Sequence, residues 1–210
     1  MSSNGGKNMD SKERTQRLVT RAIFIAIIAL QTMVPALGYI PLGFVSLTII
    51  HITVIVAAIM MGPVDGMLIG FVWGALTVVR AFMTPTSPLD TIIFTNPIVS
   101  VIPRVLVGLV AGLVFRTLYR KFENLTVASI VAAIFGTLTN TFLVVTLMGT
   151  LYTSTLTKSY NVSSAGLVKV LMGIIGSNGV VEVGAAVVIT PLIIQALSKT
   201  RKEFSNMYTK

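Results

Sequence analysis

The stretch NPIVSVIPRVLVGLVAGLVFR, residues 96–116, is an apolar run with one charge near its start, Arg104, and another at its end. A helix that spans a bilayer needs about 20 mostly apolar residues, and residues 98–115 come close to this length. Five further apolar runs lie along the chain, at residues 18–37, 44–61, 64–83, 127–151 and 168–197. The sequence therefore predicts an all-α integral membrane protein, a bundle of six transmembrane helices.

The composition supports this class. Only 11% of the 210 residues are charged and 54% are hydrophobic, with a mean hydropathy of +0.88. Soluble domains carry charge on about a quarter of their residues. We expect a polar N-terminal tail at residues 1–17, a membrane domain at 18–198 and a basic C-terminal tail at 199–210.

The basic residues predict the orientation, because lysine and arginine gather in cytosolic loops. With the N terminus inside, twelve of the sixteen basic residues fall on the cytosolic side, and Arg80, Arg104, Lys158 and Lys169 fall on the outer side. Both termini are therefore predicted to be cytosolic. Arg80 and Arg104 are predicted to lie near the outer end of the bundle.

Several function classes find no support in the residues. The chain has no cysteine and a single histidine, so a metal site is not expected. It contains neither a phosphate-binding G-x-x-x-x-G-K-[ST] loop nor a readable pair of nucleophile and base. Its basic residues form no patch with interleaved aromatic residues. We expect no enzyme activity, no cofactor and no nucleic-acid partner.

Arg104 is the leading candidate for substrate binding. We interpret Pro103 as the start of a helix, because proline suits a first turn. The free amides of that turn would then form an anion site together with the guanidinium. The alternatives are that Arg104 extends to the outer headgroups or pairs with Glu182.

Other polar residues within the apolar runs are candidates, because such residues usually face a cavity or a partner. Trp73, Thr77 and Arg80 share one helical face, and so do Asn178 and Glu182. Interfacial anchoring, a structural ion pair and hydrogen bonding between helices are the respective alternatives for Arg80, Glu182 and Asn140. For His51, packing is favoured over ligand binding. The candidate substrate-binding residues are Arg104, Asn96, Arg80, Trp73, Asn140, Asn178, Glu182, Thr48, His51 and Tyr39.

Small residues recur at helical spacing in two of the runs. Ala22, Ala26 and Ala29 would form a flat strip on the first helix, against which another helix can pack closely. This strip could serve internal packing or a partner subunit. For Gly108 and Gly112 in the fourth run, packing within the bundle is favoured.

Four stretches carry a resemblance to a known family. They are IPLGFVSLTIIHITVIVAAIMMGPVDGMLIGFVWG (40–74), FTNPIVSVIPRVLVGLVAG (94–112), NTFLVV (140–145) and NGVVE (178–182). They resemble the substrate-binding S components of energy-coupling factor (ECF) transporters, which import vitamins in prokaryotes. The resemblance implies six helices in the cell membrane and a vitamin site near the outer face, covered by the loop at residues 38–44. It also implies that Ala22 and Ala26 contact a transmembrane T component, that two ATPases hydrolyse the ATP, and that the S component reorients during transport.

Within this family, the residues favour pantothenate. Two arginines favour an anion, and the asparagines with Glu182 suit hydroxyl and amide groups. Trp73 and Tyr39 offer little stacking surface for a flat ring system, which leaves folate as the second choice. A stand-alone, proton-coupled secondary transporter is the alternative class. The chain shows no convincing repeated halves, which such transporters usually have.

Overall fold

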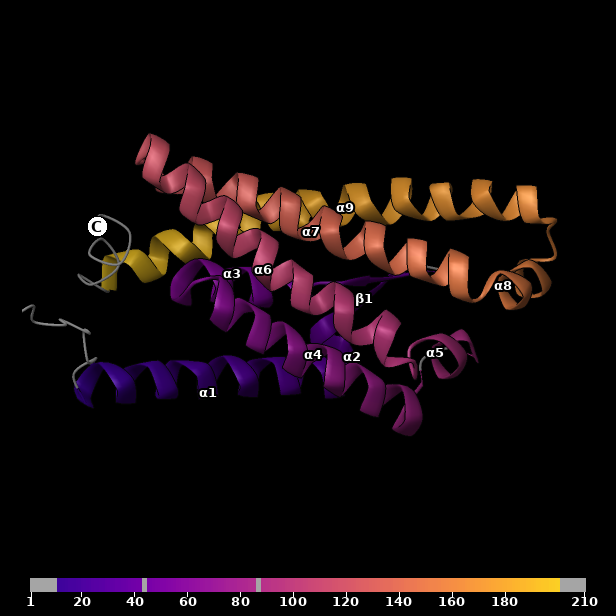
Figure 1. Cartoon of the computed structure of the whole chain (residues 1–210), viewed down its shortest axis with the longest axis horizontal. Helices are drawn as coiled ribbons and strands as arrows, with labels where there is room; N and C mark the ends of the chain where they lie inside the picture. The colour runs from indigo at the N-terminus through magenta and orange to yellow at the C-terminus, as the bar shows by residue number, and fades with distance from the viewer. Residues whose placement is uncertain (1–10, 43–44, 86–87, 201–210) are drawn as a thin grey trace, which may run out of the picture.

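A computed structural model describes residues 11–42, 45–85 and 88–200, and most of them lie in helices (Figure 1). The elements in chain order are α1 (Ser11–Met33), α2 (Pro35–Gly38), β1 (Tyr39–Leu42), β2 (Val45–Thr48), α3 (Ile50–Met61), α4 (Pro63–Met83), α5 (Pro88–Ile93), α6 (Pro97–Phe122), α7 (Leu125–Leu151), α8 (Thr153–Tyr160) and α9 (Ser164–Thr200).

Among the described residues, five helices are long and apolar enough to cross a membrane: α1, α4, α6, α7 and α9. They correspond to five of the six apolar runs. The predicted helical membrane protein is thus confirmed, with five spans of sufficient length.

The second apolar run, residues 44–61, differs from the prediction of a full transmembrane helix. Its first part forms β2, which pairs antiparallel with β1. The helix that follows, α3, has 12 residues, or about 18 Å at 1.5 Å per residue. A hydrocarbon core is about 30 Å thick, so α3 alone is too short to cross it.

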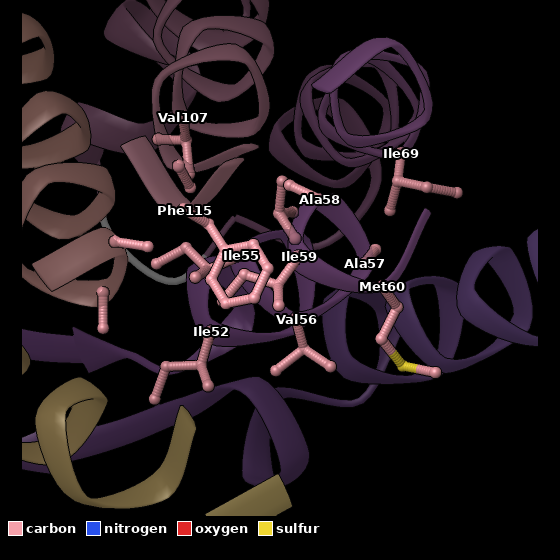
Figure 2. Packing of buried hydrophobic residues seen from close by; sticks show 14 of the residues in the cluster. Ile52, Ile55, Val56, Ala57, Ala58, Ile59, Met60, Ile69, Val107 and Phe115 are labelled. Atoms are coloured by element: carbon pink, nitrogen blue, oxygen red, sulfur yellow. The ribbon is translucent and has the colours of Figure 1, made fainter. Parts of the chain in front are cut away.

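The position of α3 explains why a short helix is apolar on all sides. Ten of its residues are buried, and it packs against α1, α4, α6, α7 and α9. Figure 2 shows Ile55 and Ile59 of α3 close to Phe115 of α6. A helix that is hydrophobic all round is one enclosed by protein, and α3 forms the centre of the core.

The helix ends define two ends of the bundle. The start of α1 and the end of α9 lie at one end, which we call the terminal end (Figure 1). The short helices α5 and α8 lie at the opposite end, which we call the loop end. The first and last described helices therefore begin and finish, respectively, at the same end of the bundle.

Helices α4 and α6 pack closely through glycine. Gly66, Gly70 and Gly74 recur at four-residue spacing along α4. A Cβ atom on Gly70 would lie 2.1 Å from the Arg104 carbonyl oxygen, and one on Gly108 would lie 2.1 Å from that of Gly66. Gly108 thus serves packing within the bundle, as expected. The close contact also holds the backbone of Arg104 directly against α4.

We expect Gly70→Ala to destabilise the protein by about 1–3 kcal/mol, because the added methyl group forces the backbones of α4 and α6 apart. The matched control is Gly176→Ala on α9, where an added Cβ meets nothing within 4 Å. This control should be neutral or stabilising by up to about 1 kcal/mol, since alanine favours a helix. Thermal unfolding in detergent measures both. Equal melting temperatures for the two variants would contradict the close packing.

An ion cluster joins α1 to α4 at the terminal end. The side chain of Asp65 is buried, and its two oxygens pair with Arg17 and Arg21, each at 2.5 Å. The Nε–H groups of both arginines also donate to Asp65, at 2.8 and 2.7 Å. Asp65 was not among the residues predicted from the sequence to be important. Its contacts fix one end of α1, most of which is exposed apolar surface.

Asp65→Asn should lower stability by about 1–3 kcal/mol, because the buried side chain loses its charge and both arginines lose their counterion. We place this effect below that of a fully buried pair, since the arginine side chains are 37% and 29% exposed. Glu13→Gln on exposed α1 surface removes the same charge and should have little effect. Thermal unfolding compares the two. An unchanged melting temperature for Asp65→Asn would show that the cluster does not stabilise α1.

Candidate substrate-binding site

Arg104 lies inside α6, and this corrects the interpretation of Pro103 as a helix start. The helix begins at Pro97, and Asn96 caps it by accepting a hydrogen bond from the Ile98 N–H at 2.9 Å. Pro103 is therefore an internal proline. The free amides of the first turn lie near Asn96, so they do not form an anion site with the Arg104 guanidinium.

Pro103 has a different role beside Arg104. Because proline has no N–H, an internal proline leaves the carbonyl group four residues earlier without its helical donor. That carbonyl belongs to Val99, and Arg104 Nη1 donates to it at 2.7 Å. The two adjacent residues act together, since Pro103 exposes an acceptor and Arg104 uses it.

Two aromatic rings further hold the guanidinium. Its Cζ atom lies 5.0 Å from the ring centroid of Trp73 on α4 and 5.5 Å from that of Phe94, which follows α5. Arg104 is 5% exposed and Trp73 is 1% exposed. Cations are attracted to ring faces, most strongly where water is excluded. The charge is thus fixed within the bundle and does not extend to its surface.

Glu182 on α9 joins three parts of the chain. One of its oxygens accepts a hydrogen bond from the Thr48 N–H at 3.2 Å, and the other accepts from the Thr141 hydroxyl at 3.0 Å. Arg104 also attracts Glu182 electrostatically. The carboxylate therefore links the end of β2 to α7 and α9, within the field of the arginine. Thr141 was not predicted, although it follows Asn140 as a second polar residue in an apolar run.

Two buried polar groups around this network have no hydrogen-bond partner among the described residues. They are the Asn140 side-chain oxygen and the Trp73 indole nitrogen. The His51 ring is fully buried and lies beside the Thr48 backbone. Buried polar groups nearly always have a partner, so the Asn140 oxygen and the Trp73 nitrogen are available to a polar ligand. Described contacts run from Trp73 to Arg104, from Arg104 to Glu182, and from Glu182 to Thr141 and Thr48, and Asn140 directly precedes Thr141 in the sequence.

The structure gives other predicted residues local partners. Arg80 is 3% exposed and forms an ion pair with Asp90 on α5 at 3.3 Å. Thr77 donates to the Trp73 carbonyl within α4, at 2.9 Å. The side-chain amide of Asn96 donates to the Tyr152 hydroxyl at 3.0 Å. Arg80 and Asn96 thus brace the loop end of the bundle.

The remaining candidates are less defined by contacts. Asn178 is half-buried on α9, one turn before Glu182. The side chain of Tyr39 lies outside the part of the structure that is described. On α1, Ala22 and Ala26 are exposed and Ala29 is half-buried, so the alanine strip faces away from most of the bundle.

Comparison with known proteins places this arrangement in a family. Residues 16–194 match the family described as the substrate-specific component of ECF transporters. The chain belongs to this family. Membership of this transporter family explains why the chain has several long apolar helices. The chain is therefore a multi-pass membrane protein.

Individual relatives also belong to transporters, and this S component resembles them over most of its length. It is 36% identical over 190 residues to the pantothenate transporter PanT of Leuconostoc mesenteroides, covering 87% of this chain and 92% of the relative. It is 32% identical over 203 residues to the pantothenic acid transporter PanT of Lactococcus lactis, covering 90% and 97%. A crystal structure of a biotin S component from an ECF-type ABC transporter has the same fold, with a TM-score of 0.62, 14% identity and coverage of 97% and 100%.

Proposed function

We propose that this S component binds pantothenate at the outer face of a prokaryotic cell membrane and delivers it to a T component and two ABC ATPases by reorienting in the bilayer. The observation that carries the proposal is the buried Arg104 guanidinium, held against Trp73 beside polar groups that lack partners. The names of the two relatives agree with this substrate.

The chemistry of pantothenate suits these groups. A desolvated carboxylate binds most strongly to a guanidinium, through charge-assisted hydrogen bonds. Pantothenate also carries hydroxyl and amide groups, which can donate to the Asn140 oxygen and accept from the Trp73 indole N–H. The imidazole of His51 can do either. We assign Glu182 to ordering Thr48 and Thr141 around the ligand, since both of its oxygens already accept hydrogen bonds.

Folate is less suitable as a substrate. Its broad ring system would need an aromatic face on which to stack. The Arg104 guanidinium already lies over the rings of both Trp73 and Phe94. A small and flexible anion does not need a ring face on which to stack.

Calorimetry on the purified full-length protein tests the substrate, with pantothenate and folate titrated separately. We expect pantothenate to bind and folate to bind far more weakly. Native mass spectrometry of the same sample should reveal co-purified pantothenate if the affinity is high. Absence of pantothenate binding by folded protein, or tighter binding of folate, would contradict the assignment.

Reconstitution tests the mode of transport. We expect liposomes that contain only this protein to take up no pantothenate under a proton gradient, because the energy comes from ATP hydrolysis by partner subunits. Addition of the T component and the ATPases with internal ATP should permit uptake. Uptake driven by the proton gradient alone would instead identify a secondary transporter.

A further inference from the structure

We infer that Phe94 is a positioning residue for pantothenate binding, which presses the Arg104 guanidinium into the place where it meets the carboxylate. The inference rests on the proposed function and deepens it. Phe94 follows the last residue of α5, and its ring is one of the two aromatic rings over which the guanidinium lies, at 5.5 Å.

Two hydrogen bonds of Phe94 and one ion pair of Asp90 hold this segment in place. The Asp90 carbonyl accepts from the Phe94 N–H at 2.9 Å, while the Asp90 carboxylate pairs with Arg80 of α4 at 3.3 Å. On the other side, the Ser100 hydroxyl of α6 donates to the Phe94 carbonyl at 2.6 Å. The short segment around Phe94 is therefore tied to both helices that carry the ligand-binding pair, α4 with Trp73 and α6 with Arg104.

A small apolar cluster packs against this segment. Ile93 is fully buried with Val99 of α6, and Leu156 of α8 and Leu167 of α9 complete the buried cluster. Phe94 packs against this cluster as a partly buried neighbour. Phe94 thus contacts both the apolar cluster and the Arg104 cation.

The physical consequence concerns the freedom of Arg104. An arginine side chain has many rotamers, and fixing them on binding reduces affinity. Here the Val99 carbonyl and the rings of Trp73 and Phe94 fix the guanidinium in advance. Removing the Phe94 ring should release the guanidinium on that side without removing its charge, so the loss should fall on binding of the carboxylate.

The test is calorimetry with two ligands, pantothenate and its alcohol analogue, in which a hydroxymethyl group replaces the carboxylate. Phe94→Leu keeps apolar volume but removes the ring, and we expect about tenfold weaker binding of pantothenate. Affinity for the alcohol analogue should change less than twofold. Phe94→Tyr keeps the ring and should recover most of the affinity for pantothenate.

Asp90→Asn provides a second route that leaves the ring in place. This substitution weakens the ion pair with Arg80 and so loosens the segment that carries Phe94. Pantothenate affinity should fall by about threefold, again with little change for the alcohol analogue. If Phe94→Leu does not fold, Asp90→Asn and Phe94→Tyr decide the question. Asp90→Asn must then lower the preference for the carboxylate, and Phe94→Tyr must preserve it.

Other outcomes overturn the inference. If Phe94→Leu folds and binds pantothenate like the wild type, Phe94 does not position Arg104. If both ligands weaken equally, the ring serves packing only. Failure of the proposed function looks different, because wild-type protein would then not bind pantothenate, or Arg104→Ala would bind it unchanged.

Discussion

Arg104→Ala should weaken pantothenate binding by about 2 kcal/mol or more, which is roughly thirtyfold. The substitution removes the guanidinium that lies over the ring of Trp73. A carboxylate in this water-poor position would then have no guanidinium to compensate for the loss of its hydration. Calorimetry with purified protein in detergent measures the change.

The helix itself offers a control for this experiment. Arg104→Ala also removes the donor to the Val99 carbonyl, so lower stability could be mistaken for a binding effect. The double variant Pro103→Ala with Arg104→Ala restores a backbone N–H at position 103 and thus the ordinary helical hydrogen bond to Val99. We expect the double variant to be at least as stable as the single variant and equally weak in binding. Wild-type affinity in a folded Arg104→Ala protein would exclude Arg104 from the site.

The sequence allowed the membrane class and five of the spans to be predicted, and it singled out Arg104, Trp73 and Glu182, which the structure buries inside the bundle. The reason is that each signal is local, either a long apolar run or a polar residue within one. The start of α6 was also encoded locally, as an N-cap residue and a proline in Asn96 and Pro97. Pro103 carries the same proline signal six residues after Pro97, inside the helix, so the proline next to the charge was wrongly interpreted as the helix start.

The second apolar run shows a limit of hydropathy. Residues 44–61 are apolar throughout, but hydropathy alone does not separate a spanning helix from a strand followed by a buried helix. The outcome depends on α3 being enclosed by five other helices. Non-helical backbone at membrane depth is tolerated where protein surrounds it, and that condition is a property of the assembled bundle.

The ion pairs were missed because they depend on tertiary structure. Asp65 meets arginines that precede it by 48 and 44 residues. Asp90 lies in the six-residue helix α5, in a segment that the sequence suggested was a turn between two spans. Arg80 was proposed as a substrate-binding residue because it shares a helical face with Trp73 and Thr77, and the structure adds an ion pair with Asp90 that the sequence did not indicate. The role of Phe94 likewise appears only when α5 is placed beside α6.

The second large expected effect concerns transport and follows from the exposed face of α1. Ala22 and Ala26 are exposed, and so are Ile23, Ile27 and Leu30 around them. We propose, from the family resemblance, that this strip of small residues contacts the T component. Small residues allow helices to approach closely, because packing drives helix association in a bilayer. A long side chain at Ala26 should prevent that approach.

Ala26→Arg is therefore expected to abolish ATP-dependent uptake while leaving pantothenate affinity within twofold of the wild type, because the described contacts of Arg104 with Val99, Trp73 and Phe94 all lie outside α1. The matched control is Val188→Arg on α9, a residue that is 58% exposed. An arginine within a span raises the insertion free energy by about 2.5–3.5 kcal/mol in either place, so loss of transport in Ala26→Arg alone isolates the contact. Co-purification with the T component should fail for Ala26→Arg and succeed for Val188→Arg. Normal uptake by Ala26→Arg would show that the alanine strip is not the coupling surface, and the partner would have to bind another face of the bundle.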